Sequence, residues 1–446
     1  MNYKSLHEKE LKLLLNVVEK QQYVEGYKLV HNKETIEIMN IVEKFAKDKK
    51  LIFYGGTAIN NILPEEDKFY KSSSEIPDYD MFSKTALNDA KELAKIYFEK
   101  GFINTEAKSG IHSGTYKVYV NFIPIADITQ IPTCIYESLL RHGVKGNKML
   151  NVPPNFLKMS AYLELSRPLG DVSRWEKVYK RLQLLNKNYP LKYNCKNYIS
   201  SDSTHEKISN EDYKNVTNEL FKMKNYVYFG QFAISLYSKY LPINIKKHLT
   251  VNVFDILCEN PENESKLLKN KLKNKFPNIK ITKMNEIGEV IPLVYNLEID
   301  DKININLYKS TGCVSYNLVH KSKKNIKIAS IETILSLYLA FTFCKDRYND
   351  VIDYLLCMCE MLINVQKANP LSRTGITRRF ALSCQGKQKT LKDIRSDKSK
   401  LYYKLYSNKR SKEYEKHFLN YKPEKLKTKK NTILKNKKNK SRKKNM

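Results

Sequence analysis

The stretch from Leu51 to Asp80 constrains the fold more than any other part of this chain. It starts with the apolar run Leu-Ile-Phe-Tyr, breaks at Gly55-Gly56-Thr57, and continues in the helix-like residues 58–63. This order predicts a short buried strand, a glycine turn and the start of a helix. Backbone N–H groups at such a helix N-terminus are suited to bind phosphate, so the turn predicts a nucleotide site.

The same stretch ends in an Asp-X-Asp sequence formed by Asp78 and Asp80. Side chains alternate along a strand, so both carboxylates are expected on one face. Neighbouring carboxylates repel one another, and a divalent cation such as Mg²⁺ or Mn²⁺ is their usual partner. The pair therefore predicts a metal site beside the phosphate-binding turn.

A third carboxylate follows in the β-rich segment 116–129. Asp127 lies late in this segment, between Ala126 and Ile128. Unpaired carboxylates are rarely buried, so an aspartate in this position needs a reason. A strand end or a helix N-cap is one reason, but with Asp78 and Asp80 upstream we expect a third metal ligand.

Residues 226–234 repeat the pattern of residues 51–59 more weakly. Gln231 replaces the second glycine, and the strand expected to follow carries only Asp255. This copy should be unable to bind two metal ions and is expected to serve the architecture or RNA contacts. Chance similarity over such short segments is the alternative.

Lysine and arginine outnumber the acidic residues by 79 to 47, which gives a formal net charge of +32. This excess favours a polyanionic partner, although an AT-rich genome also enriches lysine and asparagine. Twelve of the 25 residues from Lys422 to Met446 are basic and one is acidic, which predicts a disordered tail that attracts phosphate backbones. A nuclear-localisation signal has a similar composition.

The cysteines and the apolar runs bear on the compartment. Eight cysteines show no CxxC pair and eight histidines show no zinc pattern, so we expect reduced cysteines without structural zinc. The amphipathic N-terminus is unlike a signal peptide, and the uncharged runs are too short to span a bilayer. The sequence predicts a soluble, non-secreted protein without a membrane partner.

The motifs GGTAIN, PDYDMF, IADIT and SRWEKVYKRL resemble the poly(A) polymerase catalytic subunits of large DNA viruses, the poxvirus and giant-virus group. These enzymes belong to the DNA polymerase β-like nucleotidyltransferase superfamily. The resemblance extends over residues 40–190, although the gap between Gly56 and Asp78 is longer than in many members. It implies an α+β fold with a mixed nucleotidyltransferase sheet and flanking helices, followed by a second, degenerate nucleotidyltransferase-like domain.

Four segments follow from these patterns: a catalytic domain (1–190), a polar linker (191–222), a degenerate domain (223–370) and a basic, largely disordered tail (371–446).

The resemblance implies template-independent addition of AMP from ATP to RNA 3′ ends by two-metal phosphoryl transfer, in viral mRNA polyadenylation. Asp78 and Asp80 would hold both Mg²⁺ ions, and Asp127 would complete the site of the ion that activates the RNA 3′-hydroxyl. The triphosphate would contact a set of backbone and side-chain groups, namely the N–H groups of Gly55 and Gly56, the hydroxyl of Thr57, Lys158 and Lys177.

Other basic residues are expected to bind RNA. Arg174, Lys177 and Arg181 fall at positions i, i+3 and i+7 and so share one helix face, although a solvated face has the same pattern. Arg378 and Arg379 lie together near the basic tail.

The sequence leaves three questions open, which are the type of activity, the oligomeric state and the location. The same triad would serve a CCA-adding or an oligoadenylate-type transferase, and a non-catalytic RNA-binding adaptor is a further alternative. The enzyme could act alone, as a homodimer or with a separate processivity subunit. The host cytoplasm, where viral factories form, is the expected location, with the virion as a second one.

Overall fold

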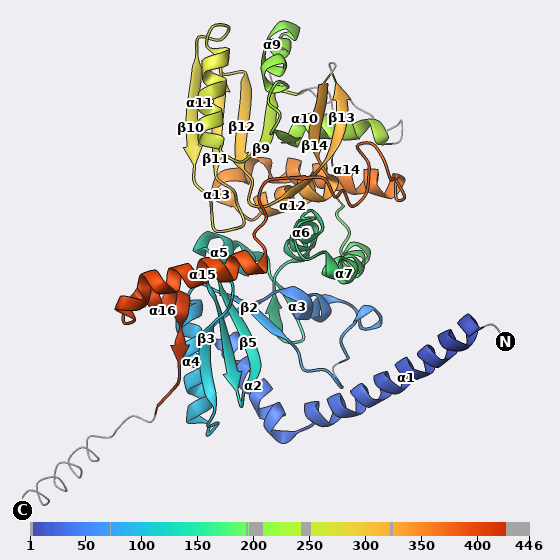
Figure 1. Cartoon of the computed structure of the whole chain (residues 1–446), viewed down its shortest axis with the longest axis vertical. Helices are drawn as coiled ribbons and strands as arrows, with labels where there is room; N and C mark the ends of the chain where they lie inside the picture. Colours follow the sequence, from blue (N-terminus) through green and yellow to red (C-terminus); the bar gives the residue numbers. More distant parts are fainter. Residues whose placement is uncertain are drawn as a thin grey trace, which may run out of the picture.

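The computed structural model describes residues 3–71, 73–192, 195, 208–241, 251–321 and 324–424. The chain forms two α/β parts stacked along the long axis of the molecule, each built on an eight-stranded sheet with parallel and antiparallel pairs (Figure 1). The predicted α+β class with mixed sheets is confirmed.

The first part begins with two helices and alternates strands and helices up to residue 188. Its elements are α1 (Tyr3–Val30), α2 (Lys33–Asp48), β1 (Ile52–Phe53), α3 (Gly55–Ile62), β2 (Tyr79–Ser83), α4 (Ala86–Glu99), β3 (Thr105–Ser109), β4 (Thr115–Val120), β5 (Ile123–Gln130), α5 (Thr133–His142), β6 (Val144–Gly146), β7 (Met149–Asn151), α6 (Pro154–Leu165) and α7 (Trp175–Asn188).

The second part follows the same alternation. Its elements are α9 (Asn210–Leu220), β8 (Val227–Phe229), α10 (Gly230–Tyr237), β9 (Val253–Cys258), α11 (Pro261–Leu272), β10 (Ile279–Met284), β11 (Val294–Ile299), β12 (Ile303–Lys309), β13 (Val314–Lys321), β14 (Lys324–Ala329), α12 (Ile331–Phe341), α13 (Lys345–Tyr348) and α14 (Ile352–Ala368). The chain then continues through β15 (Cys384–Gln385), α15 (Leu391–Leu405), α16 (Lys412–Phe418) and β16 (Asn420–Tyr421).

The two sheets have the same strand order. The first runs β16-β3-β4-β5-β2-β1-β7-β6, and the second runs β10-β11-β12-β9-β8-β14-β13-β15. We match β3 with β10, β4 with β11, and so on along both sheets to β6 with β13. Each pair of neighbouring strands in the first sheet is then parallel or antiparallel in the same way as its counterpart in the second. For example, β2–β5 and β9–β12 are both parallel. The repeat read from the sequence is therefore also a repeat of topology.

Helices α2 and α4 cover one face of the first sheet. The Tyr97 hydroxyl of α4 donates to the Ile38 carbonyl of α2 at 2.7 Å, and the Tyr79 hydroxyl of β2 donates to Glu43 of α2 at 2.6 Å. Because side chains alternate along β2, Asp80 lies on the opposite face from Tyr79.

The two parts meet where α6 and α12 lie side by side (Figure 1). Phe156 of α6 and Phe343, just after α12, pack edge to face with ring centroids 5.3 Å apart. Both helices have several fully buried apolar residues, so this contact continues the cores of both parts. These two helices also hold equivalent positions in the repeat, since α6 follows β7 and α12 follows the matching strand β14.

The C-terminal segment differs from the prediction. Residues 371–424 were expected to be largely disordered, but they contain β15, α15, α16 and β16. Strand β16 pairs with β3, so the chain returns to the first sheet and extends its edge. Composition could not predict this, because the apolar contacts that hold the segment come from distant residues. The remainder of the predicted tail, residues 425–446, lies outside the described residues.

Two further predictions need correction or limits. The end of the expected linker is α9, whose Val216 and Leu220 are fully buried in the second core, whereas residues 196–207 lie outside the described part. The expectation of reduced cysteines is wrong for four of them in this structure, since Cys195 is joined to Cys357 and Cys313 to Cys384.

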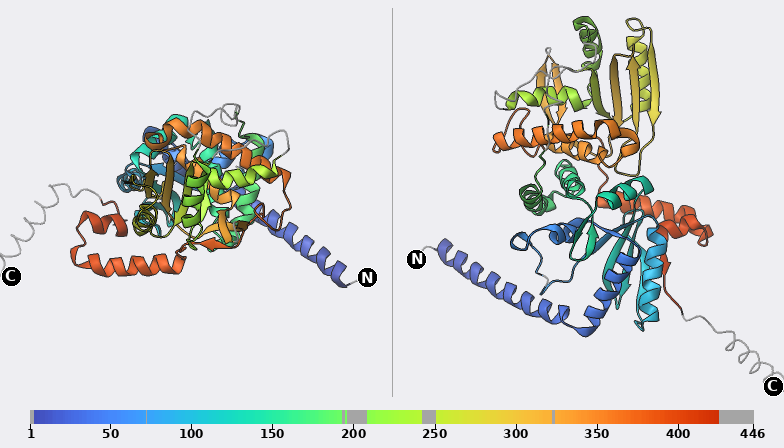
Figure 2. Two further views of the ribbon diagram at one scale, coloured as in Figure 1. Left: turned by 90° about the horizontal axis from the view of Figure 1, so that it is seen from above. Right: turned by 180° about the vertical axis from the view of Figure 1, so that it is seen from behind.

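Most of helix α1 projects away from the rest of the molecule (Figure 2), although Gly26 lies against Ser74 of the loop before β2. Its leucines and valines are largely exposed to solvent, among them Leu11, Leu14 and Val18. Among the described residues, no helix has the length and apolar character needed to cross a bilayer.

Candidate active site

The glycine turn after β1 is held against the carboxylate of Asp80. Gly55 begins α3 with φ +73°, and a Cβ at this position would lie 2.8 Å from Asp80 Oδ2. The Tyr54 N–H donates to the Asp80 carbonyl at 3.0 Å. Both the backbone conformation and the close carboxylate therefore require glycine here.

Thr57 connects the turn to the entry of β2. Its hydroxyl donates to the backbone carbonyl of Asp78 at 2.7 Å, and its side chain is buried. The predicted contact between this hydroxyl and the triphosphate does not fit, because the hydroxyl is already used inside the protein. Asp78 itself is exposed directly before β2, with its backbone fixed by Thr57.

Asp80 and Asp127 face each other on neighbouring strands. They are register partners in the parallel pair β2–β5, which brings the distant Asp127 beside the Asp-X-Asp sequence. Burial, together with the charges of Asp78 and Asp127, raises the pKa of Asp80 to about 7. The structure thus gathers all three predicted carboxylates closely enough for their charges to interact.

Lys117, which the sequence reasoning missed, is the cationic partner of this group. It lies opposite Asp127 on β4, and its ammonium group forms an ion pair with Asp127 Oδ2. Burial lowers the pKa of Lys117, but the hydrogen bond and charge of Asp127 outweigh burial and raise it. The period-two alternation in β4 could have placed Lys117 on a face, but only the β4–β5 register identifies its partner.

A flat aromatic pair adjoins the carboxylates. Tyr54 and Phe82 stack with ring centroids 3.9 Å apart and an interplanar angle of 9°. The Tyr54 hydroxyl lies 3.0 Å from Thr129 Oγ1, and Thr129 lies two residues after Asp127 on the same face. Burial and the charge of Asp80 raise the Tyr54 pKa, so the phenol stays neutral.

Arg181 reaches the glycine turn from α7. Its guanidinium donates to the Tyr70 hydroxyl at 2.7 Å and lies over the rings of Phe69 and Tyr70, 4.7 and 5.5 Å from their centroids. A Cβ at Gly56 would lie 2.6 Å from the Tyr70 hydroxyl and 2.9 Å from an Arg181 nitrogen. Of the residues predicted to bind RNA, Arg181 is thus the one placed beside the Gly55-Gly56 turn.

The loop between α3 and β2 is held by several contacts. The Asn60 side chain accepts hydrogen bonds from the N–H groups of Phe69 and Tyr70, each at 2.9 Å. Asp67 forms an ion pair with Lys187 of α7 at 2.7 Å. This loop is therefore fastened to α3 and α7.

The other basic candidates of this part do not share the place of Arg181. Lys158 is fully buried, its ammonium group donates to the Tyr189 carbonyl, and burial lowers its pKa to about 8. Its predicted phosphate contact is wrong, because the ammonium group faces the protein interior. Arg174 Nε lies 3.3 Å from Glu164, and its charge also acts on Asp80, whose pKa it lowers against the larger effect of burial. Lys177 is exposed on α7.

Arg378 and Arg379 lie in the second part, on the segment that follows α14. The Arg379 guanidinium is 3.4 Å from the buried Glu332 carboxylate, so its charge is already paired within the protein. Arg378 is half-buried beside Asn317. The structure does not bring either arginine to the carboxylates.

The carboxylates fit a divalent cation by their chemistry. Asp80 and Asp127 offer oxygen donors on neighbouring strands, and their mutual repulsion needs a cationic partner. In this structure Lys117 supplies that charge at Asp127. Within the described residues, no group of three or more His, Cys, Asp or Glu side chains is arranged to hold a metal ion.

The second part keeps only half of this arrangement. Gly230 has φ +64°, and a Cβ there would lie 1.9 Å from Asp255 Oδ2, which repeats the contact of Gly55 with Asp80. The register partner of Asp255 on β12 is Asn306, which donates to Asp255 at 2.8 Å. Val253 stands two residues before Asp255, where Asp78 precedes Asp80.

Part of this chain is similar to proteins described as poly(A) polymerase catalytic subunits. Residues 40–171 match the family model described as "Poly(A) polymerase catalytic subunit". An African swine fever virus protein assigned as a poly(A) polymerase catalytic subunit is 32% identical over 154 residues, 33% of this chain and 32% of that protein. A mimivirus protein of the same assignment is 30% identical over 151 residues, 33% of this chain and 25% of that protein.

The predicted resemblance is confirmed over this region, which spans about a third or less of each of these relatives. A solved structure, the Megavirus polyadenylate synthase, matches over 91% of this chain and 84% of its own, with a TM-score of 0.74 and 20% identity. This likeness shows that the two proteins share a fold across both parts.

Proposed function

We propose that this chain is a template-independent poly(A) polymerase that transfers AMP from ATP to the 3′ end of RNA. The observation that carries the proposal is the register of Asp80 with Asp127 beside the Gly55 turn, within the region that matches the poly(A) polymerase family model. This arrangement brings a phosphate-binding backbone and a set of carboxylates to one place, as nucleotidyl transfer requires.

Asp78, Asp80 and Asp127 would hold divalent cations, Mg²⁺ or Mn²⁺. When bound, such ions stabilise the charge that develops on the phosphoryl oxygens and favour ionisation of the attacking hydroxyl. Lys117 keeps Asp127 in place and balances its charge in the absence of ions.

The triphosphate would bind at the N-terminus of α3. The N–H groups of Gly55 and Gly56 open this helix and are suited to bind phosphate oxygens. Arg181, adjacent to Gly56, supplies a planar cation suited to phosphate oxygens. We assign this role to Arg181 in place of the buried Lys158.

Primer extension tests the proposal directly. The full chain is incubated with Mg²⁺, an unstructured RNA and each of the four nucleoside triphosphates separately, and product lengths are resolved on a denaturing gel. ATP should give long tails, and the other nucleotides should give few additions. Equal use of CTP would favour a CCA-adding enzyme, and short 2′–5′-linked products would favour an oligoadenylate-type enzyme.

A non-catalytic RNA-binding adaptor is the alternative from another class. It predicts RNA binding without incorporation of any nucleotide, under all metal conditions. The carboxylate set in the first part, against its loss in the second, supports the catalytic role.

We place this activity in the host cytoplasm, with viral mRNA as the substrate. A homodimer or a separate processivity subunit is compatible with this role. Sedimentation of the purified chain with and without RNA tests self-association.

A further inference from the structure

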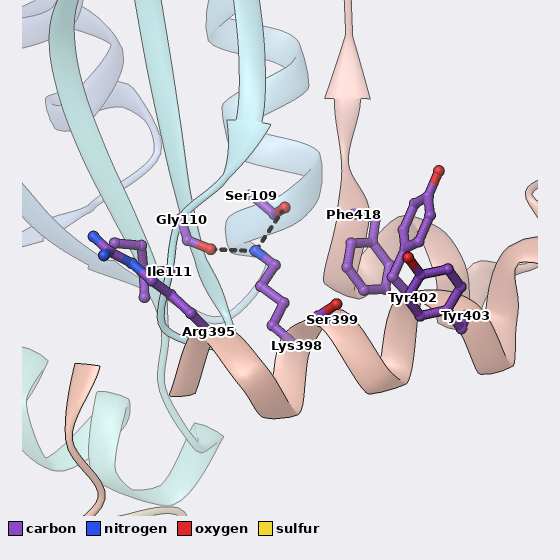
Figure 3. Close-up of a pocket in the computed structure, with 9 residues that line it drawn as sticks. All are labelled: Ser109, Gly110, Ile111, Arg395, Lys398, Ser399, Tyr402, Tyr403 and Phe418. Carbon is purple, nitrogen blue, oxygen red and sulfur yellow. Dashed lines mark hydrogen bonds between the residues drawn. The ribbon is translucent and has the colours of Figure 1, made fainter. Parts of the chain in front are cut away.

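A shallow groove of about 320 Å³ lies between α15 and the turn that joins β3 to β4 (Figure 3). Its walls combine aromatic, basic and small polar residues, which are Ser109, Gly110, Ile111, Arg395, Lys398, Ser399, Tyr402, Tyr403 and Phe418.

One face of α15 points into this groove. The residues of α15 that line the groove recur at the spacing of one helical face. In a helix packed on a hydrophobic core, that face would carry aliphatic side chains. Here that face carries Arg395, Ser399 and Tyr403, all exposed, and the Tyr403 side chain has 77% of its surface open to solvent. An exposed aromatic ring on the same face as a guanidinium is suited to a flat, negatively charged ligand.

The groove is held firmly on the first sheet. Lys398 donates to the Gly110 carbonyl at 2.6 Å, as Figure 3 shows, and Tyr402 packs edge to face on Phe418 with centroids 5.3 Å apart. Strand β16 follows α16 directly and pairs with β3. The ligand surface is therefore preformed rather than assembled on binding.

The groove is also connected to the carboxylate-bearing strands. The turn at its wall accepts a hydrogen bond at the Gly114 carbonyl from the N–H of Gln130, at 2.8 Å. Gln130 ends β5, three residues after Asp127. A polymer in the groove would thus lie along the same sheet as the catalytic carboxylates.

The charge of the surrounding segment agrees with a polyanion. Residues 387–424 contain twelve lysines and arginines and five acidic residues. Next to the groove, the Lys409 ammonium lies 3.9 Å from the centroid of the exposed Tyr406 ring. Alternating cations and aromatic rings are the pattern by which proteins bind single-stranded nucleic acid without sequence selectivity.

We propose that this groove binds the single-stranded body of the RNA primer, upstream of its reacting 3′ end. A base stacks on Tyr403, and the adjoining phosphates pair with Arg395. The inference rests on the proposed function, because it assigns a second contact surface for the same RNA substrate. It also gives the C-terminal segment a reason to return to the catalytic sheet.

Affinity measurements with RNA primers of two lengths test the proposal. Binding of the full chain is measured by fluorescence anisotropy without ATP, with labelled RNAs of about 6 and about 25 nucleotides, which bracket usual single-strand site sizes. The Arg395→Ala and Tyr403→Ala double variant should lose about tenfold in affinity for the long RNA and little for the short one. Tyr403→Phe should retain the affinity, because it keeps the stacking ring.

Lys404→Ala is the matched control, because it removes one exposed charge from a different face of the same helix. Equal losses of RNA affinity for Lys404→Ala and Arg395→Ala would mean that only the overall positive charge of the helix matters. This result would overturn the proposal. A changed oligomeric state with unchanged RNA affinity would do the same, since it would assign the groove to a second copy of the chain.

Photo-crosslinking locates the contact independently. A long RNA with one thiouridine upstream of its 3′ end should attach to a peptide that contains residues 395–403, as read by mass spectrometry. Attachment elsewhere alone would contradict the groove assignment. If the groove binds RNA but the chain adds no AMP, the polymerase proposal fails while the binding result stands.

Discussion

The two sheets of this molecule share a topology but differ in what fills the space beside the glycine turn. In the first sheet that space has Asp78, Asp80 and Asp127 with a lysine beside them. In the second, Asp255 lies near aromatic residues, since burial and the charge of Asp255 raise the pKa values of Tyr308 and Tyr354. Tyr308 in turn stacks on Phe341 with centroids 5.6 Å apart. One region is charged and partly exposed, and the other is packed like a core.

The feature that both regions keep is the contact between a left-handed glycine and an aspartate. Gly55 lies against Asp80 and Gly230 against Asp255, although only the first pair belongs to a complete carboxylate set. The contact therefore belongs to the architecture of the strand–turn–helix unit. The residues that differ are Asp78, its Thr57 tether and Asp127, and we propose that these together with Asp80 make the first region functional.

Substituting one aspartate in each sheet should give the largest difference in activity between the two regions. Asp80→Asn preserves shape but deletes a charge, and we expect AMP incorporation to fall on the order of 10³-fold, about 4 kcal/mol of transition-state stabilisation. Asp78→Ala should act similarly, whereas Asp255→Asn should leave incorporation unchanged. Primer extension measures the rates, and anisotropy should show that RNA binding survives in all three variants. Full activity in both first-part variants would remove the catalytic assignment.

The shared glycines separate architecture from catalysis. Gly230→Ala forces an alanine into a left-handed conformation, with its Cβ 1.9 Å from Asp255 Oδ2. We expect a loss of roughly 2–4 kcal/mol in the free energy of unfolding. Gly55→Ala should lose both stability and activity, since it also disturbs Asp80.

Gly375→Ala is the control for the backbone term, because Gly375 has φ +69° and no atom within 4 Å of an added Cβ. This substitution should lower the free energy of unfolding by about 1 kcal/mol. Urea unfolding monitored by circular dichroism provides the three values. Equal costs at Gly230 and Gly375 would show that the carboxylate contact contributes nothing.

The half-buried Asp255 should make the second part sensitive to pH. Burial raises the pKa of Asp255 to about 6, partly offset by the hydrogen bond from Asn306. The folded state therefore holds the proton more tightly than the unfolded state. The stabilisation is present below pH 4 and is lost as the pH rises from about 4 to about 6.

Asp255→Asn should remove this dependence and stabilise the chain at pH 7 by up to about 3 kcal/mol relative to wild type. The measurement is the difference in free energy of unfolding between the variant and wild type, at pH 4.5 and pH 7.5. A difference that does not grow with pH would mean that Asp255 stays ionised in the folded chain.

The local part of this comparison was predictable from the sequence. The glycine turn, Asp78, Asp80 and the weaker repeat are short patterns, and alternation along a strand relates their side chains directly. Asp127 was predictable because a carboxylate in an apolar strand is unusual. These predictions depend on neighbours within a few residues, where backbone geometry is nearly fixed.

The rest depends on contacts that no local pattern contains. Lys117 meets Asp127 only through the β4–β5 register, which shifts between Val118 and Tyr119. Arg181 approaches Gly56 from more than a hundred residues away, and β16 reaches β3 from the far end of the chain. Lys158 was misassigned because helix periodicity does not reveal which neighbouring helix covers a given face.

The smallest contrast concerns Arg181 and Lys177, two cations on the same face of α7. Arg181 lies beside Gly56 with its guanidinium held by Tyr70, whereas Lys177 is exposed one turn earlier. A positioned charge-assisted contact is worth about 1.5–3 kcal/mol, and a solvated charge much less. Arg181→Ala should therefore raise the KM for ATP about tenfold with a smaller change in kcat, and Lys177→Ala should change KM less than about twofold.

Steady-state incorporation at varied ATP, with saturating RNA, measures both constants. Equal effects of the two substitutions would mean that the face acts as a diffuse positive field, and Arg181 would lose its place at the triphosphate.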